Sequence, residues 1–280
     1  MSCGLFRHKQ GTVTLSCGAL LLGTLAGLAL FAPLIAPANP IDVNLSQRLI
    51  PPFESSALLG TDQLGRCVLS RLLHGARITF TAVFAILSFT VLSGTLLGCL
   101  AGQGPAWVDG LLTRFTDGVM AFPGLILALA IAGILGPGLS SVILALCGVQ
   151  WVRFFRLARS MTASLRERAY VQAAIISGAG TWAIMIGHVL PKLLPSVAVL
   201  ATLQMGRIVL SVSSLSFLGL GAIPPAPEWG AMLSESKTYM QSAPYLFFLP
   251  GFCIFLAVLG GQLMGMGLQK KLDLSRKGYL

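Results

Sequence analysis

The sequence predicts an all-α, polytopic membrane protein with six transmembrane helices. Of its 280 residues, 55% are hydrophobic and only 10% are charged, and the mean hydropathy is +0.83. Soluble domains usually carry about 25% charged residues, so this composition disfavours a soluble fold. A helix needs about 20 mostly apolar residues to cross the hydrocarbon core of a bilayer. Since such segments account for most of the chain, we expect one transmembrane domain over residues 1–280.

Six apolar segments are candidates for these spans, and loops rich in glycine and proline separate them. The first, second, fifth and sixth exceed the length that a span requires. The third and fourth are short and rich in glycine, so their ends are the least sharply defined. The predicted spans are residues 13–35, 78–101, 118–135, 140–155, 193–215 and 245–268.

The first apolar segment could instead be a cleavable secretory signal. A basic stretch precedes it, and Ala36-Pro37-Ala38 resembles a small-residue cleavage site. Its apolar run is longer than the roughly 7–15 residues of a signal core. We therefore expect a retained first span.

The distribution of basic residues predicts the orientation of the spans. With the N-terminus in the cytoplasm, 13 Lys and Arg residues fall in cytoplasmic segments and 5 in outer ones. Because Lys and Arg are enriched in cytoplasmic loops, both termini are expected inside the cell. This placement also accounts for the formal net charge of +10 without nucleic acid as a partner.

The cysteines and histidines form no recognisable metal or disulfide framework. The six cysteines contain no CxxC pair, and four of them lie in apolar runs, where they suit helix packing. The three histidines are scattered along the chain. We therefore expect no metal site.

The polar segment at 166–191, between the fourth and fifth spans, carries the most informative motif. It contains Gln172-Ala173-Ala174, then Gly178 after three residues, and later His188-Val189-Leu190-Pro191. The two small alanines would let a short helix sit closely in a partner's groove. Gly178 could provide a break with positive φ between two short helices. Pro191 suits the first turn of the next span, where its missing N–H is harmless.

This segment resembles the cytoplasmic coupling loop of ATP-binding-cassette (ABC) importer permeases. Their signature is Glu-Ala-Ala, three residues, Gly, and a later Leu-Pro, and Gln172 stands here in place of the Glu. The alternative is an ordinary basic amphipathic loop at the membrane surface. The resemblance implies that one set of residues contacts an ATPase subunit: Gln172, Ala173, Ala174, Gly178, His188, Leu190 and Pro191.

Two further motifs resemble the peptide and nickel branch of these permeases. Leu58-Leu59-Gly60-Thr61-Asp62 continues through Gly65-Arg66, and an ion pair between Asp62 and Arg66 could lock this loop. The apolar residues at 68–73 have the spacing of a short helix lying on the membrane. The segment at 215–230 ends in Glu228-Trp229-Gly230, and Trp229 would suit the outer membrane interface. We expect Asp62, Arg66, Glu228 and Trp229 to have structural roles in the outer loops.

Arg207 lies inside the predicted fifth span, where a charged side chain must face protein or water. It could attract an anionic group on a solute in a pathway that Ser211 and Ser214 would also line. Snorkelling or an internal ion pair is the alternative.

The chain contains no Gly-xxxx-Gly-Lys-Ser/Thr phosphate loop and no convincing catalytic constellation. We therefore expect a non-catalytic subunit without a cofactor of its own, and ATP with Mg²⁺ on partner subunits.

The resemblance, with a core at about residues 76–269, implies the second permease subunit of an importer in a bacterial inner membrane. Its partners would be a homologous permease, two ATP-binding subunits and an outer substrate-binding protein. The motifs favour nickel or a metal chelate as solute, with dipeptides or oligopeptides as the alternative. An ion-coupled secondary transporter is a remote alternative, because the spans contain almost no carboxylates.

Overall fold

The computed structural model describes residues 2–54 and 57–277, with side chains described for 11–54 and 57–272. The side chains of four basic residues that contribute to the predicted orientation therefore lie outside the described part: Arg7, Lys9, Arg276 and Lys277. The principal helices are α1 (Ser2–Leu30), α2 (Ala32–Ile35), α3 (Val68–Gln103), α4 (Ala106–Met120), α5 (Gly124–Leu135), α6 (Leu139–Arg166), α7 (Ala169–Ile176), α8 (Thr181–Ile184), α9 (Leu190–Phe217), α10 (Trp229–Ser236) and α11 (Tyr245–Lys277). Three short turns complete the fold: the 3₁₀ segments η1 (Leu45–Gln47) and η3 (Lys237–Tyr239), and the π-helical η2 (Met185–Val189).

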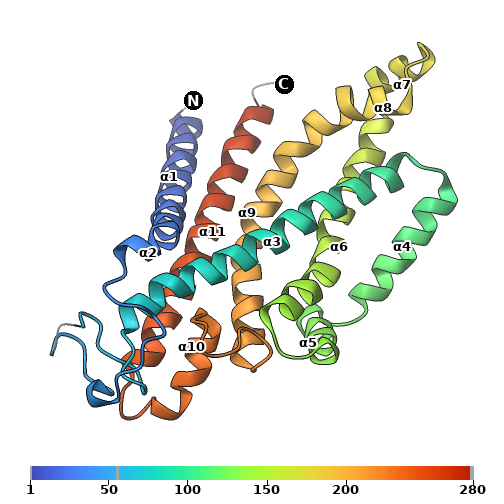
Figure 1. Cartoon of the computed structure of the whole chain (residues 1–280). Coiled ribbons are helices and arrows are strands. Elements are labelled where there is room, and N and C mark those ends of the chain that lie inside the picture. The colour runs from blue at the N-terminus through green and yellow to red at the C-terminus, as the bar shows by residue number, and fades with distance from the viewer. Residues whose placement is uncertain (1, 55–56, 278–280) are drawn as a thin grey trace.

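The long helices run alternately up and down in Figure 1. Both termini lie at one end of the molecule together with α7 and α8, and α2, α5 and α10 lie at the other end. Within the described residues, five helices are long and apolar enough to cross a membrane, and the bent pair α4–α5 makes a sixth span if counted as one. The predicted all-α membrane fold is confirmed.

The predicted third span at 118–135 is wrong as a continuous helix. The chain breaks after α4, and α5 starts after Pro123 at 88° to α4. Proline lacks a backbone N–H and disfavours helical backbone in the residue before it, so Phe122 and Pro123 end the regular helix. The 15 residues of α4 reach only about 22 Å, and the bend forms an elbow at one side of the molecule.

Two other helices are longer than predicted. α3 starts at Val68, and Val68 and Leu72 are buried, so the short surface helix expected at 68–73 is the first part of this span. α6 continues to Arg166, well beyond the predicted end of the fourth span at residue 155. Arg156, Arg159 and Arg166 are therefore helical and do not lie in a loop. Arg156 and Arg159 pair from α6 with Asp117 and Asp109 of α4.

The backbones of α3 and α6 approach closely along a row of glycines spaced four residues apart. A Cβ atom on Gly94 would lie 2.4 Å from the Trp151 carbonyl oxygen, and one on Gly98 would lie 2.4 Å from that of Phe155. Gly102 faces Thr162 in the same way. Small residues at this spacing let membrane helices pack backbone to backbone. The G-x-x-x-G spacing of these glycines is visible in the sequence.

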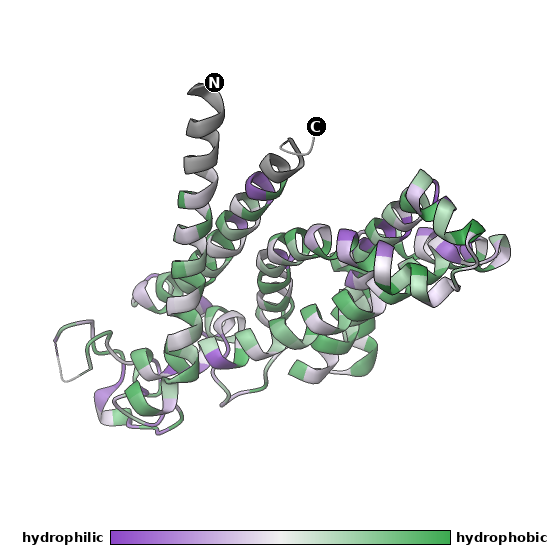
Figure 2. Ribbon diagram, turned by 90° about the horizontal axis from the view of Figure 1, so that it is seen from above, coloured by the Kyte–Doolittle hydropathy of each residue, from purple (hydrophilic) through white to green (hydrophobic). Residues whose placement is uncertain are grey.

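The outward faces of the bundle are apolar. Figure 2 shows hydrophobic residues along most of the helices, with hydrophilic residues in loops and near the C-terminal end of α11. Leu92, Leu144 and Phe248 are large, apolar and mostly exposed. Such faces suit contact with lipid or with another membrane subunit.

Gly98→Ala should destabilise the protein by about 1–3 kcal/mol, because the added methyl group meets rigid backbone of α6. Gly133→Ala in α5 is the matched control, since no atom lies within 4 Å of its added Cβ. Thermal unfolding of the purified variants in detergent measures the difference. Equal midpoints for the two variants would contradict this account of the α3–α6 contact.

Candidate functional site

Gly178 separates α7 from the segment that leads into α9. Its φ is +82°, which confirms the predicted break with positive φ. No neighbouring atom lies within 4 Å of a Cβ at this position, so backbone conformation alone requires glycine. Pro191 lies in the first turn of α9, also as predicted.

The side chain of Gln172 ties α7 to the end of α6. Its Nε2 donates to the carbonyl oxygen of Arg166 at 2.7 Å. That carbonyl is one of the last four of α6, which have no partner within their own helix. A glutamate carboxylate could not donate this bond, so glutamine has a distinct structural role here.

Tyr170 ties α7 to α9 as well. Its ring stacks on His188 of η2 with a centroid separation of 6.1 Å, and the Lys192 Nζ lies 4.0 Å from the Tyr170 centroid. Ala173 is exposed and Ala174 half-buried, and Leu190 lies where η2 joins α9. The residues expected in a coupling loop therefore lie on one compact unit at the end of α6 and α9.

Apolar side chains project from this unit without cover from the described chain. Ile176 is 85% exposed and Trp182 is 69% exposed. These residues lie beside polar turns at the end of the long helices, as Figure 1 shows for α7 and α8. Exposed apolar groups at such a position suit a protein contact.

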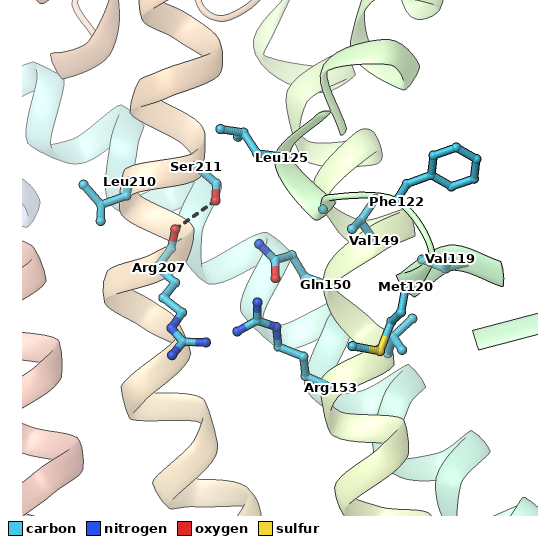
Figure 3. Close-up of a pocket in the computed structure, with 12 residues that line it drawn as sticks. Val119, Met120, Phe122, Leu125, Val149, Gln150, Arg153, Arg207, Leu210 and Ser211 are labelled. Atoms are coloured by element: carbon cyan, nitrogen blue, oxygen red, sulfur yellow. Dashed lines mark hydrogen bonds between the residues drawn. The ribbon is translucent and has the colours of Figure 1, made fainter. Parts of the chain in front are cut away.

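A cavity of about 490 Å³ lies between the α4–α5 elbow, α6 and α9. Figure 3 shows that Arg207 of α9 and Arg153 of α6 extend into the space between these two helices. The Ser211 hydroxyl donates to the Arg207 carbonyl oxygen at 2.9 Å. Of the pathway residues that the sequence suggested, Arg207 and Ser211 line the cavity, whereas Ser214 does not.

Arg153 and Gln150 also line the cavity, and neither residue was predicted there from the sequence. α6 is 28 residues long, and Arg153 lies near its middle rather than close to the end of the span predicted at 140–155. The Arg153 Nη1 donates to the Gln204 Oε1 at 3.1 Å. The signal that could have found it is the absence of a helix terminator between 140 and 166.

At the end of the molecule that holds α10, four buried or half-buried charged side chains join the loop before α3, α3 itself and α10. Arg66 pairs with Asp62 at 2.6 Å, as the sequence predicted, and with Glu235 of α10 at 2.8 Å. Arg71 of α3 pairs with the same two carboxylates. This charged cluster fastens the loop before α3 to α10.

Glu228 and Trp229 lie inside the protein. The Glu228 carboxylate caps α10 through the Ala231 N–H at 3.0 Å and accepts from the Thr79 hydroxyl at 3.1 Å. Burial raises the pKa of Glu228, while hydrogen bonds, above all from backbone N–H groups, act against this rise.

The position expected for Trp229 at the outer membrane interface is wrong. Its side chain is 1% exposed, donates to the Leu72 carbonyl oxygen at 3.0 Å and packs edge-on against Phe80. The close approach of α10 to α3 buries it.

Arg71→Met should destabilise the protein by about 3–5 kcal/mol, because it leaves two carboxylates sharing a single arginine in a buried site. Arg77→Met on the same helix is the control, since the Arg77 side chain is exposed. Thermal unfolding in detergent, together with the amount of protein in the membrane, reports the effect. Equal behaviour of the two variants would mean that the charged cluster does not hold the outer loop.

Comparison with known proteins agrees with this geometry. The family model for the "binding-protein-dependent transport system inner membrane component" matches residues 94–275. The chain is 40% identical over 256 residues to the dipeptide transport system permease protein DppC of Alkalihalophilus pseudofirmus, covering 91% of this chain and 84% of the relative.

Two further relatives are named for the transport of other solutes. The glutathione transport system permease protein GsiD of Pectobacterium atrosepticum is 38% identical, with 95% of this chain and 88% of the relative covered. The nickel transport system permease protein NikC of Escherichia coli K12 is 37% identical, with 91% of both chains covered. The remote alternative of an ion-coupled secondary transporter is therefore wrong. The chain belongs to the family of inner membrane components of binding-protein-dependent transport systems, and it is a permease of the ABC importer type.

Proposed function

We propose that this chain forms one half of a transmembrane pathway for a short peptide, and that α7 receives the movement of an ATPase subunit. The proposal rests on the contacts that join α7 to two helices of the cavity. Gln172 fastens α7 to α6, Tyr170 fastens it to η2 and α9, and α6 and α9 are two walls of the cavity. A displacement of α7 would therefore reach both walls.

The proposed partners follow from this arrangement. Two ATP-binding subunits would provide ATP and Mg²⁺, and one of them would cover Ile176 and Trp182. A homologous permease would close the cavity, and a substrate-binding protein would deliver the solute at the end that holds α10. ATP binding would then open the cavity outward, and hydrolysis would return it to the inward-facing state.

A short peptide is the first candidate solute. The relatives named for dipeptide, glutathione and nickel transport are 40%, 38% and 37% identical, and these small differences do not discriminate between solutes. The two arginines in the cavity favour a solute with a free carboxylate, which every unmodified peptide carries.

Nickel held by a small carboxylate chelator is the second candidate, because the same arginines would accept its carboxylates. A bare nickel cation would be repelled by both guanidinium groups, and nitrogen or sulfur ligands would suit it better.

We further propose that both termini and α7 face the cytoplasm and that the charged cluster faces outward. Ser46 and Ser177 are exposed near opposite ends, so each can be replaced by cysteine in a cysteine-free chain. An impermeant thiol reagent added to intact cells should label position 46, and should label position 177 only after permeabilisation. The reverse pattern would invert the orientation.

Gly178→Val should uncouple ATP hydrolysis from transport. A β-branched residue at this φ costs about 1–3 kcal/mol of backbone strain, which the loop can relieve by turning α7 away from its present direction. Gly180→Val is the matched control, because Gly180 has a φ of −67° and equally open surroundings.

The measurement is the ratio of solute uptake to ATP hydrolysis in proteoliposomes that contain the complete complex. Labelled dipeptide and nickel with a carboxylate chelator are the two solutes. We expect a ratio at least about ten-fold lower for Gly178→Val than for the control, because a redirected α7 would no longer pass the movement of the ATPase subunit to α6 and α9. Equal ratios for the two variants would remove α7 from the coupling mechanism.

A further inference from the structure

We infer that Arg153 and Arg207 together form an anion-binding site that receives a solute carboxylate, and that Gln204 positions Arg153 within it. The assignment of the anion to a solute rests on the proposed function. The existence of the site rests on geometry alone and can be tested separately.

The two guanidinium groups enter the same cavity from different helices. Arg153 comes from α6 and Arg207 from α9, and Figure 3 shows both heads directed into the space between these helices, with the Gln150 amide beside them. Because both groups are positively charged and face the same space, they repel each other. The Ser211 hydroxyl lies one turn along α9 from Arg207 and lines the same cavity.

The cavity offers these arginines no negative charge of its own. Of the twelve lining residues in the described part of the chain, none is acidic and most are apolar. Among the described residues, neither Arg153 nor Arg207 forms a salt bridge. Both arginines are exposed to the cavity. An anion bound between them would offset their mutual repulsion.

Gln204 holds Arg153 without neutralising it. The Gln204 side chain is 1% exposed, and its Oε1 accepts from the Arg153 Nη1 at 3.1 Å. A carboxylate at this position would provide the same hydrogen bond and cancel the charge. Glutamine fixes the direction of the guanidinium and leaves its charge available, which a neutral amide can do and an acid cannot.

The charged cluster at the opposite end shows the contrast. There, Arg66 and Arg71 each pair with both Asp62 and Glu235. Arg66 and Arg71, which fasten the loop before α3 to α10, are thus neutralised by carboxylates of the same chain. Arg153 differs from them in having the neutral Gln204 amide as its partner, and no carboxylate of the described residues pairs with Arg207. Both charges therefore stay available for an anion.

The first test measures the electrostatic potential of the cavity without assuming a solute. Ser211→Cys in a cysteine-free chain, assembled in the complete complex, places a thiol in the cavity. Its rates of reaction are compared for two methanethiosulfonates of similar size, one bearing an anionic sulfonate and one a quaternary ammonium. Arg153→Gln and Gln204→Glu, which is nearly isosteric, should each lower the anionic-to-cationic rate ratio by about five-fold or more.

Arg114→Gln is the matched control, because Arg114 is exposed on α4 and does not line the cavity. This variant should leave the rate ratio unchanged. Ratios that do not change for Arg153→Gln and Gln204→Glu would overturn the inference, because they would show that the charge of Arg153 does not set the electrostatic potential of the cavity. Co-purification of the ATPase subunits confirms that each variant is assembled.

The second test connects the site to the solute. Uptake of a labelled dipeptide and of its C-terminal amide is measured with the same binding protein, so that a change in the acid-to-amide ratio arises in the permease. Arg153→Gln and Arg207→Gln should lower this ratio at least about five-fold, and Arg114→Gln should not. An unchanged ratio would overturn the role of the site in receiving a solute carboxylate. If neither peptide is transported while the thiol rates change as expected, the anion-binding site stands and the proposed peptide function fails.

Discussion

The close approach of α3 and α6 along Gly94, Gly98 and Gly102 determines where the other elements can lie. Because these glycines let the two backbones touch, α6 is fixed along the length of α3, and its opposite side is free to face α9 across the cavity. The α4–α5 elbow then covers one side of this space, with Met120 and Phe122 on its lining. A bulkier α3 would push α6 away and alter the cavity walls together.

Arginine has two different roles in this chain, and the partner of each side chain distinguishes them. At one end, Arg66 and Arg71 share carboxylates and join α10 to the loop before α3, so their charge is used within the fold. In the cavity, Arg153 has a neutral amide as its partner, and its charge remains available. Residue type alone does not separate these roles, and burial is not sufficient either. The feature that separates Arg66 and Arg71 from Arg153 is whether a carboxylate of the same chain lies opposite.

Local signals in the sequence predicted local structure well. The spacing of Asp62 and Arg66 anticipated their ion pair, and the sequence around Gly178 anticipated its positive φ. Features that depend on distant segments were not predictable in this way. Trp229 was expected at a membrane interface, but α3 buries it, and Glu235 joins the charged cluster from about 170 residues away. Arg153 lines the cavity because α6 extends well beyond the predicted span and leaves this residue near its middle. Packing as well as hydropathy sets the boundary of a span.

The junction between α7 and α9 combines a deformable segment with a contact that bridges it. Residues 185–189 are π-helical, and Pro191 and Pro195 follow within the first turns of α9, so backbone hydrogen bonding is weak over this stretch. A displacement of α7 that is transmitted only along the backbone would deform this stretch instead of moving α9. Tyr170, however, stacks on His188 inside the π-helical turn and also contacts Lys192 beyond it. The side-chain contact thus provides a shorter route from α7 to α9 than the backbone does. Since Gln172 holds α7 to α6 by a second contact, one short helix is joined to both helices that line the cavity with the arginine pair.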